Sequence, residues 1–416
     1  MVSLLAERRL AWIVVVFFFA GSVMSYVDRA VLGIVIPQVR KDLSITNTEY
    51  SLAINAFLIM YMFFYVLGGR LADRLGSRRT FTLNIVFWSI ASMAHALSRG
   101  IASLCVFRGL LGIGEGGFFP TAMRGTAEWF RSENRAKAVG ILLCGISLGM
   151  VLTPPVVAWI TLRHGWRAAF LVTGAMGFLL IPPWLMFHHY VKKVYGKADP
   201  APAFQRPEGN APSHEVLSLR QVLTRRKYWL FLLARALPDT VTFFYLFWLP
   251  AYFQDVRHYD LEKVGKLLWI PFLCADVGAV GGAWLSSALI RRGWGLHAGR
   301  KVVLFGSAIC PMLGACAFLV NAHTLALALV SLALFGHFSW SANIQTVVTE
   351  ITPRNHVGAL YGLTGAAGTL AGALTQPLIG SSVDRLGYAP AFLGTAIVYV
   401  LALVFLTSAG KIETIR

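Results

Sequence analysis

The chain contains repeated apolar runs, each long enough to cross a lipid bilayer. A membrane-spanning helix needs about 20 mostly apolar residues, since each residue adds about 1.5 Å along the helix axis. Such runs recur through all 416 residues, and the mean hydropathy is +0.64. Charged residues make up 13% of the chain, about half the share usual in soluble domains. The sequence therefore predicts a protein that crosses the membrane many times.

We expect an all-α membrane protein with twelve spans in two halves of six. Lipid offers no hydrogen-bond partner to the backbone, so each span must satisfy its own peptide groups as a helix. The ten-residue alternation typical of a membrane β-barrel does not occur. The expected spans cover residues 10–37, 50–69, 80–98, 103–125, 137–160, 166–189, 228–253, 264–290, 301–320, 323–349, 357–382 and 388–409.

The formal net charge of +18 reflects membrane topology and does not indicate nucleic-acid binding. The basic residues gather in segments on one side of successive spans, and the positive-inside rule predicts that this side is cytoplasmic. Both termini are then expected in the cytoplasm. The segments contain Arg8, Arg9, Arg70, Arg74, Arg78, Arg79, Arg131, Arg135, Lys137, Lys192, Lys193, Lys197, Arg220, Arg225, Arg226, Lys227, Arg291, Arg292, Arg300 and Lys301.

One long polar stretch, residues 190–226, divides the chain. We interpret it as a cytoplasmic linker between an N-terminal six-helix bundle, residues 1–189, and a C-terminal bundle, residues 227–416. The halves share a sparse pattern at one fixed spacing of 222 residues, which pairs Arg163 with Arg385 and Gly140 with Gly362. This fits two parallel repeats with a central cavity between them near the membrane midplane.

The loop between the second and third spans reads "GRLADRLGSRR" from Gly69 to Arg79. Gly69 would allow close helix approach, Gly76 can take a positive φ, and Asp73 is placed among arginines near a helix N-terminus. An ordinary basic loop would explain the arginines but not the spacing of the glycines and the acid. The segment resembles the signature loop of the major facilitator superfamily, and the resemblance covers the whole chain. It implies that Gly69, Asp73, Arg74, Gly76 and Arg78 form a conformational gate motif.

Two further segments narrow the resemblance. "SYVDRAVLG" at residues 25–33 and "RGLLGIGEGGFFP" at residues 108–120 look like the anion:cation symporter branch of that superfamily. "FYLFWLP" at residues 244–250 and "YGLTGA" at residues 361–366 are similar to bacterial hexuronate and hexonate (galactonate) transporters. The resemblance implies proton-coupled symport of a sugar acid by alternating access in the bacterial cytoplasmic (inner) membrane.

Four ionisable residues interrupt the apolar spans: Asp28, Arg29, Arg108 and Glu115. A charge within the bilayer costs several kcal/mol unless it is paired or faces a cavity. Arg108 and Glu115 are two helical turns apart and share one face of their span. The resemblance makes the first and fourth spans neighbours, so we expect one net-neutral group. A purely structural ion-pair network is the alternative, although buried ion pairs contribute poorly to stability.

The chemistry of these residues predicts their roles. The guanidinium of Arg29 presents a planar fork matched to a substrate carboxylate, as the resemblance also implies. Burial and a neighbouring arginine shift a carboxyl pKa in opposite directions, so Asp28 and Glu115 are expected to load and unload protons. Arg108 would hold Glu115 in place or hand it over during the cycle, and it is also a candidate substrate-binding residue. An anion that reaches Arg29 would displace an acid from it, which couples proton and substrate binding reciprocally.

The rest of the expected substrate site is less constrained. The resemblance places a substrate-contacting tyrosine at Tyr61. Trp340, Asn343 and Thr364 lie at suitable depth, and each either contacts the sugar or packs between helices. Asp239 is open between a hinge role and a substrate contact. Asp276 and His337 are expected to be satisfied structurally. Related sequences carry Asn or Gln in the fifth span where this chain has Gly145 and Ser147.

Other functions fit the sequence less well. An exchanger or exporter of another small carboxylate would use Arg29 and Arg108 as a paired anion site. A non-transporting anion receptor lacks a sizeable soluble domain to relay a signal. No catalytic pattern, metal spacing or phosphate loop indicates an enzyme, and the five cysteines lie singly in apolar spans. The expected partners are therefore the sugar acid anion, protons as the coupling ion and the lipid bilayer, with a monomeric chain and no cofactor.

Overall fold

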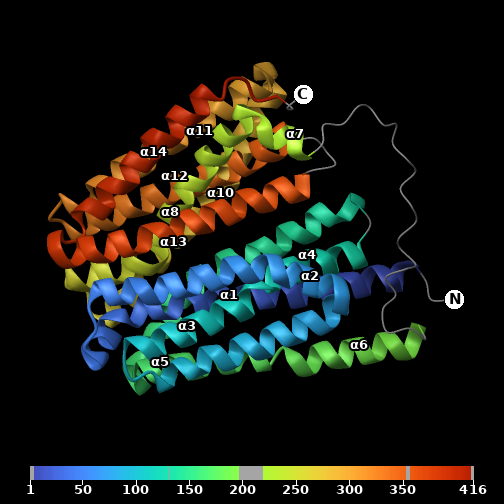
Figure 1. Ribbon diagram of the computed structural model, residues 1–416, viewed down its shortest axis with the longest axis horizontal. Coiled ribbons are helices and arrows are strands. Elements are labelled where there is room, and N and C mark those ends of the chain that lie inside the picture. The colour runs from blue at the N-terminus through green and yellow to red at the C-terminus, as the bar shows by residue number, and fades with distance from the viewer. Residues whose placement is uncertain (1–3, 131, 196–218, 353–356, 414–416) are drawn as a thin grey trace. The chain divides into compact units, whose positions relative to one another are not determined.

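The structure is a computed structural model that describes residues 4–130, 132–195, 219–352 and 357–413, and every regular element in these ranges is a helix. The chain divides into two compact units. Unit 1 comprises Met1–Gly209 and Asp260–Lys266, and unit 2 comprises Asn210–Tyr259 and Leu267–Arg416. Within each unit the long helices run along one another as a bundle (Figure 1). Residues 196–218 of the predicted linker lie outside the described residues.

Unit 1 is built from long helices joined by short turns. Its elements are α1 (Leu4–Leu43), α2 (Asn47–Ala94), the 3₁₀ turn η1 (His95–Leu97), α3 (Ile101–Gly116), α4 (Phe118–Trp129), α5 (Ser132–Phe178) and α6 (Ile181–Tyr195). The short helix α9 (Leu261–Leu267) also packs here, where Gly265 lies against Ala158 of α5.

Unit 2 repeats this plan. Its elements are α7 (Leu219–Thr224), α8 (Arg226–Asp255), α10 (Trp269–Leu289), the single π turn η3 (Ile290–Trp294), α11 (Gly295–Gly314), the 3₁₀ turn η4 (Ala315–Phe318), α12 (His323–Ile351), α13 (Val357–Leu386) and α14 (Ala389–Ser408). Hydrogen bonds tie α8 to α13, among them the bond from Trp248 Nε1 to Gln376 Oε1 at 2.8 Å.

Eight helical segments of the described chain are long and apolar enough to cross a bilayer. Three of these segments each cover two of the predicted spans to within two residues: Asn47–Leu97, Lys137–Val194 and Leu261–Phe318. The two spans meet at a glycine with positive φ in each case: Gly76 (78°), Gly165 (80°), and Gly293 (91°) with Gly295 (68°). Together with α13, which is 30 residues long, the eight segments account for the twelve predicted spans to within two residues at their ends.

Two predicted spans are interrupted, and proline explains both breaks. The predicted span 103–125 divides at Gly117 into α3 and α4, because Pro120 has no N–H to donate to the carbonyl of Gly116. The predicted span 166–189 divides at residues 179–180, just before Pro182 and Pro183. Prolines fit the first turn of the new helix α6, where the backbone N–H groups have no partner within the helix.

A lipid environment explains the outer surface of both units. Leu378 is 70% exposed, Val280 73% and Met186 70%, all on long helices. Large apolar side chains exposed in such numbers are unfavourable in water but suit contact with acyl chains.

Each unit has a hydrogen bond from an aromatic side chain to an aspartate at the end of a helix. In unit 1, Trp166 Nε1 donates to Asp42 Oδ2 at 3.1 Å. In unit 2, Tyr388 Oη donates to Asp255 Oδ2 at 3.0 Å. Trp166 and Tyr388 each follow a positive-φ glycine, Gly165 or Gly387, and stand at the repeat spacing found in the sequence. The structure therefore agrees with the prediction of repeated halves.

Arg257 anchors the loop between η4 and α12. Its guanidinium is buried and donates to the carbonyl oxygens of Ala317 (2.5 Å) and Val320 (2.5 Å) and to Tyr252 Oη (2.8 Å). We expect Arg257→Ala to lower the free energy of unfolding by about 2–3 kcal/mol, because it removes the hydrogen bonds of a buried guanidinium to Ala317, Val320 and Tyr252. The melting temperature of the purified protein in detergent measures this loss. The exposed Arg291→Ala is the control, and equal melting of the two variants would contradict the expectation.

Candidate functional site

The centre of unit 1 holds one direct ion pair between α1 and α3. Arg29 Nη2 and Nε donate to Glu115 Oε2 at 2.8 and 3.0 Å. Arg29 is 4% exposed and Glu115 is fully buried. Both donors reach the same oxygen, while Glu115 Oε1 accepts no short hydrogen bond and the Ser25 hydroxyl faces the carboxylate. The carboxylate therefore keeps one oxygen that can take a proton while the other remains on the arginine.

Glycines bring the helices around this pair close together. A Cβ on Gly116 of α3 would lie 2.7 Å from the Tyr61 carbonyl oxygen of α2. A Cβ on Gly145 of α5 would lie 2.5 Å from the Phe19 carbonyl oxygen of α1. Small residues are the usual means of close helix packing in membranes. The contact at Gly145 leaves no room for a larger side chain in this structure.

Aromatic rings surround the guanidinium of Arg29. Its Cζ lies 4.5 Å from the ring centroid of Tyr26, 4.6 Å from Tyr61 and 5.2 Å from Phe57. Cation–π contacts of this kind favour a positive charge in a desolvated site. The predicted residue Tyr61 is thus beside Arg29. Tyr26 was not predicted, although its position one turn before Arg29 on the same helix face was the signal for it.

The other two charges of unit 1 lie beside the pair without joining it directly. Arg108 Nη1 donates to the Arg29 carbonyl oxygen at 3.3 Å, while its Nε and Nη2 have no partner. Asp28 Oδ1 accepts from Ser92 Oγ at 2.8 Å. All four charges are buried in the same unit, but Asp28 turns toward α2. Its contact with Ser92 spans 64 residues and has no signal in the local sequence.

The three residues predicted in unit 2 are buried, and each contacts a neighbour within the unit. Trp340 packs edge-on against Tyr399 at 5.5 Å. Asn343 Nδ2 donates to the Ser339 carbonyl oxygen at 2.9 Å. The Thr364 carbonyl oxygen accepts from Arg235 Nη1 at 3.0 Å. Substrate contact by Trp340, Asn343 and Thr364 stays a prediction.

A second ion pair within a span lies on α8. Arg235 Nη1 donates to Asp239 Oδ2 at 2.7 Å, across one helical turn. Arg235 was not among the predicted site residues, although its four-residue spacing from Asp239 was visible in the sequence. His337 contacts Thr242 Oγ1 at 2.6 Å and Tyr399 Oη at 2.7 Å, in line with the structural role expected for it. Asp276 is half-buried on α10.

The predicted gate motif forms a polar network with α4. Asp73 Oδ1 accepts from Arg124 Nη1 at 2.6 Å, and Arg124 Nε donates to Glu128 Oε1 at 2.7 Å. Ser77 Oγ completes the network with a bond to Glu128 Oε2 at 2.5 Å. The Arg78 carbonyl oxygen accepts from Trp184 Nε1, and Arg74 is exposed. The sequence motif predicted the turn but not its partners Arg124 and Glu128, whose i,i+4 spacing was the signal.

The close approach expected at Gly69 occurs at Gly68 instead. A Cβ on Gly69 would make an ordinary 3.6 Å contact with Pro120, whereas a Cβ on Gly68 would collide with the backbone of Gly117. Gly68 lies on the face of α2 that meets α3 and α4, one residue before the predicted position.

Gly76 takes the positive φ that the sequence predicted, with φ 78° and ψ 161°. This region is essentially restricted to glycine, so Gly76→Ala is expected to cost about 1–3 kcal/mol of stability. Melting of the detergent-solubilised variant measures the cost. Gly140→Ala is the matched control, because a Cβ there meets open space and Gly140 lies within α5. A Gly76→Ala variant that melts like the control would contradict the expectation.

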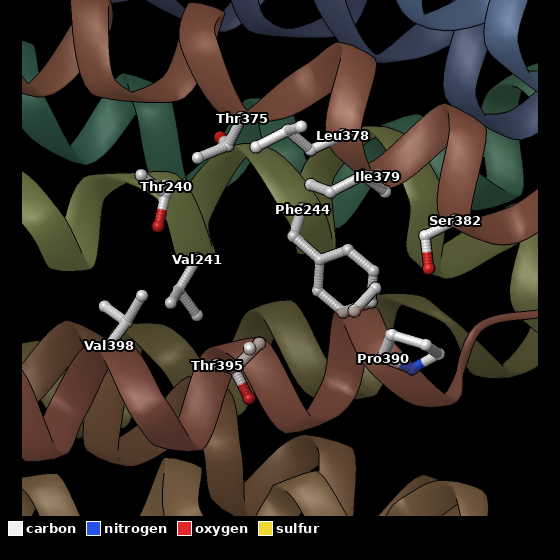
Figure 2. A pocket seen from close by; sticks show the side chains of 12 residues that line it. Thr240, Val241, Phe244, Thr375, Leu378, Ile379, Ser382, Pro390, Thr395 and Val398 are labelled. Atoms are coloured by element: carbon white, nitrogen blue, oxygen red, sulfur yellow. The ribbon is translucent and has the colours of Figure 1, made fainter. Parts of the chain in front are cut away.

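Unit 2 also contains an apolar cavity of about 260 Å³ between α8, α13 and α14. Figure 2 shows Phe244, Leu378, Pro390 and Val398 around it, with the hydroxyls of Thr240 and Thr395 nearby. No ionisable side chain lines this cavity. It therefore lacks the charge needed to hold an anion and is not the predicted substrate site. In the described part of the chain, no group of three His, Cys, Asp or Glu residues is placed to hold a metal ion.

Comparison with known proteins gives consistent matches. A sequence model of the Major Facilitator Superfamily matches residues 18–375. The hexuronate transporter of Escherichia coli K12 is 27% identical over 392 residues, covering 92% of this chain and 90% of the relative. The D-galactonate transporter of Escherichia coli O6:H1 is 28% identical, covering 98% and 97%. The probable galactarate/D-glucarate transporter of Bacillus subtilis is 30% identical, covering 90% and 86%.

Solved structures match the fold. A bacterial homologue of the human lysosomal transporter Spinster, in an inward-facing and unoccupied conformation, superposes with a TM-score of 0.75 at 18% identity. The match covers 96% of this chain and 95% of that protein.

Proposed function

The chain belongs to the Major Facilitator Superfamily, and we propose that it imports a sugar acid anion together with protons by alternating access. It is a multi-pass membrane transporter of the bacterial cytoplasmic (inner) membrane and not an enzyme. The proposal adds the substrate class and the coupling ion to this. The proton is the coupling ion, and the proposal includes no other cofactor. The working unit in the proposal is a monomer.

The Arg29–Glu115 pair carries the proposal. A guanidinium stays charged at any working pH and binds a carboxylate through two parallel N–H groups. Glu115 now occupies part of this fork. A substrate carboxylate can replace it with the same chemistry, and the rings of Tyr26 and Tyr61 offer apolar faces for the C–H surface of a sugar.

Exchange of the two carboxylates explains coupling to protons. When a substrate anion takes Arg29, Glu115 becomes a buried charge without a cation, and such a group is neutralised by a proton. Glu115 Oε1, which accepts no short hydrogen bond, is the atom that can receive it. By linkage, a proton on Glu115 also strengthens anion binding at Arg29 by the same factor. One residue thus serves the anion and another serves the proton.

Membrane energetics favour more than one proton per anion. Moving one charge against the membrane potential costs about 2.3 kcal/mol per 100 mV. Importing a monoanion with one proton is electrically neutral, so the potential contributes nothing to accumulation. A second proton makes import electrogenic and inward-directed. Asp28, which like Glu115 is 0% exposed, supplies a second carrier.

The relatives' names support a hexuronate or hexonate as the substrate class, since the matches to a hexuronate and a D-galactonate transporter span at least nine-tenths of this chain. Anion exchange is the second candidate. It is favoured by Arg108, whose buried Nε and Nη2 lack partners and would suit a second anion.

Uptake into proteoliposomes tests the proposal. Labelled glucuronate, galacturonate and galactonate are offered with an inward proton gradient, with and without a negative internal potential. We expect the gradient to drive accumulation of at least one acid and the potential to increase it. Uptake that depends on neither the proton gradient nor the potential, but requires the anion inside the vesicles, would support anion exchange. Failure of all three acids to move would reject the sugar acid class.

A further inference from the structure

A stripe of buried polar side chains runs along the end of α2 and through η1. Ser89, Ser92, His95 and Ser98 recur every three residues, which places them on one side of the helix. Each is 0% exposed. An ionisable group such as the imidazole of His95 is expensive within a membrane-spanning helix, and such groups mark paths for ions or protons.

One end of the stripe is Asp28 of α1. Ser92 Oγ donates to Asp28 Oδ1 at 2.8 Å, while Asp28 Oδ2 is buried without a partner. The hydroxyl of Thr173 on α5 also faces Asp28. Buried polar atoms in native proteins are satisfied by protein or by ordered water. These atoms together give a water molecule the two to four polar partners that it needs.

His95 lies one turn beyond Ser92. Its Nδ1 faces the carbonyl oxygens of Ala91 (2.8 Å) and Ser92 (3.2 Å). Both neighbours only accept hydrogen bonds, so Nδ1 carries the hydrogen and Nε2 carries the lone pair. Nε2 is buried and has no partner.

The surroundings of the imidazole hold it still. The ring stacks on Phe170 of α5 at 4.8 Å, and the charged group that faces it from α3 is Arg108. On the α1 side, Asp28 is linked to the region of the imidazole by its hydrogen bond with Ser92.

The other end of the stripe reaches the surface. The Ser98 carbonyl oxygen accepts from Arg167 Nη2 at 3.3 Å, and Arg167 also pairs with Asp42. The side chains of Arg167 and Asp42 are 45% and 46% exposed. Asp42 lies at the end of α1 opposite the basic N-terminal segment, on the side predicted to be non-cytoplasmic.

We propose that His95 relays protons between the non-cytoplasmic surface at Asp42 and the buried carboxylate of Asp28. Nε2 takes a proton that arrives from the surface through internal water, which makes the ring an imidazolium. It then gives a proton through water to Asp28 Oδ2 and returns to the neutral ring, while the Nδ1–H bond stays in place. The relay rests on the proposed function, because Asp28 is there a proton carrier.

Two transport modes in proteoliposomes separate this role from a structural one. Proton-driven uptake needs the relay, whereas substrate counterflow at equal pH on both sides does not. We expect His95→Gln, which keeps a donor for the carbonyls but cannot titrate, to slow proton-driven uptake at least tenfold. Its dependence on external pH is expected to flatten, with counterflow within twofold of the parent. Ser92→Ala, which removes the link to Asp28, should change uptake in the same direction.

His337→Gln is the matched control, because this buried histidine of α12 has both ring nitrogens bonded within the protein. It should leave the pH profile unchanged. An unchanged pH profile in His95→Gln overturns the relay, and so does an equal loss of uptake and counterflow, which marks a structural role. If the parent itself shows no proton-driven accumulation, the symport proposal fails and the relay fails with it. If the parent accumulates normally, only the relay is in question.

Discussion

Replacement of Arg29 by lysine is expected to lower kcat/KM for sugar acid uptake by about 100-fold. Lysine keeps the positive charge but loses the planar fork that binds a carboxylate through two N–H groups. Loss of a buried charge-assisted contact costs about 3 kcal/mol, and each 1.4 kcal/mol corresponds to a factor of ten. Arg29→Ala should abolish uptake, since it also leaves Glu115 without its cation. Initial rates of labelled uptake in proteoliposomes, normalised to the reconstituted protein, measure both effects.

Two controls keep this prediction specific to the site. Arg163→Lys changes an exposed arginine that also lies over an aromatic ring, Trp159 at 4.6 Å, and should leave uptake unchanged. Ligand-induced stabilisation, measured as the rise in melting temperature with substrate, should disappear in Arg29→Lys and persist in Arg163→Lys. Uptake by Arg29→Lys within threefold of the parent would show that the substrate carboxylate binds elsewhere.

The fold was predictable because its strongest determinants are local. Apolar run length identifies a span without knowledge of its neighbours. Positive φ at Gly76 follows from a glycine between two such runs, and the structure has it there. The breaks at Gly117 and before Pro182 were also encoded locally, by proline, but the apolar pattern on both sides concealed them. Hydropathy measures how apolar a segment is and says nothing of whether its backbone is continuous.

The contacts of the site were less predictable, because a helix that is apolar nearly all round does not show which face turns inward. The four charges of unit 1 were correctly expected to be buried, since water-free lipid leaves them no alternative. Their pairing was not determined, and Asp28 proved to contact Ser92 while Glu115 took Arg29 alone. Glycine contacts such as Gly145 against the Phe19 carbonyl decide the helix rotations, and they join residues far apart in the chain.

The two acids differ in their partners, and this difference leads to the second large effect. Glu115→Gln is expected to abolish proton-driven accumulation while substrate counterflow persists. Glutamine resembles the protonated acid in shape, so Arg29 keeps a neutral neighbour and stays available to the substrate at every pH. Counterflow, which returns one substrate for each one carried, needs no change in protonation. We therefore expect accumulation to fall at least about 100-fold and counterflow to become independent of pH, with tighter substrate binding.

Asp28→Asn provides the matched comparison, because Asp28 bonds Ser92 and does not touch Arg29. Its accumulation should also fall, but substrate affinity should stay within about twofold of the parent, since no competitor of the anion has been removed. Substrate titrations of melting temperature at two pH values measure the affinities, and uptake with an imposed gradient measures coupling. Tighter binding in Asp28→Asn than in Glu115→Gln would place the competing acid at Asp28. Accumulation that survives in Glu115→Gln would mean that its pairing with Arg29 holds the helices together and carries no proton. The expected outcome is that both variants lose accumulation and only Glu115→Gln binds the substrate more tightly. In that case Glu115 competes with the anion for Arg29, and Asp28 carries a proton without competing. Two protons can then accompany a single carboxylate.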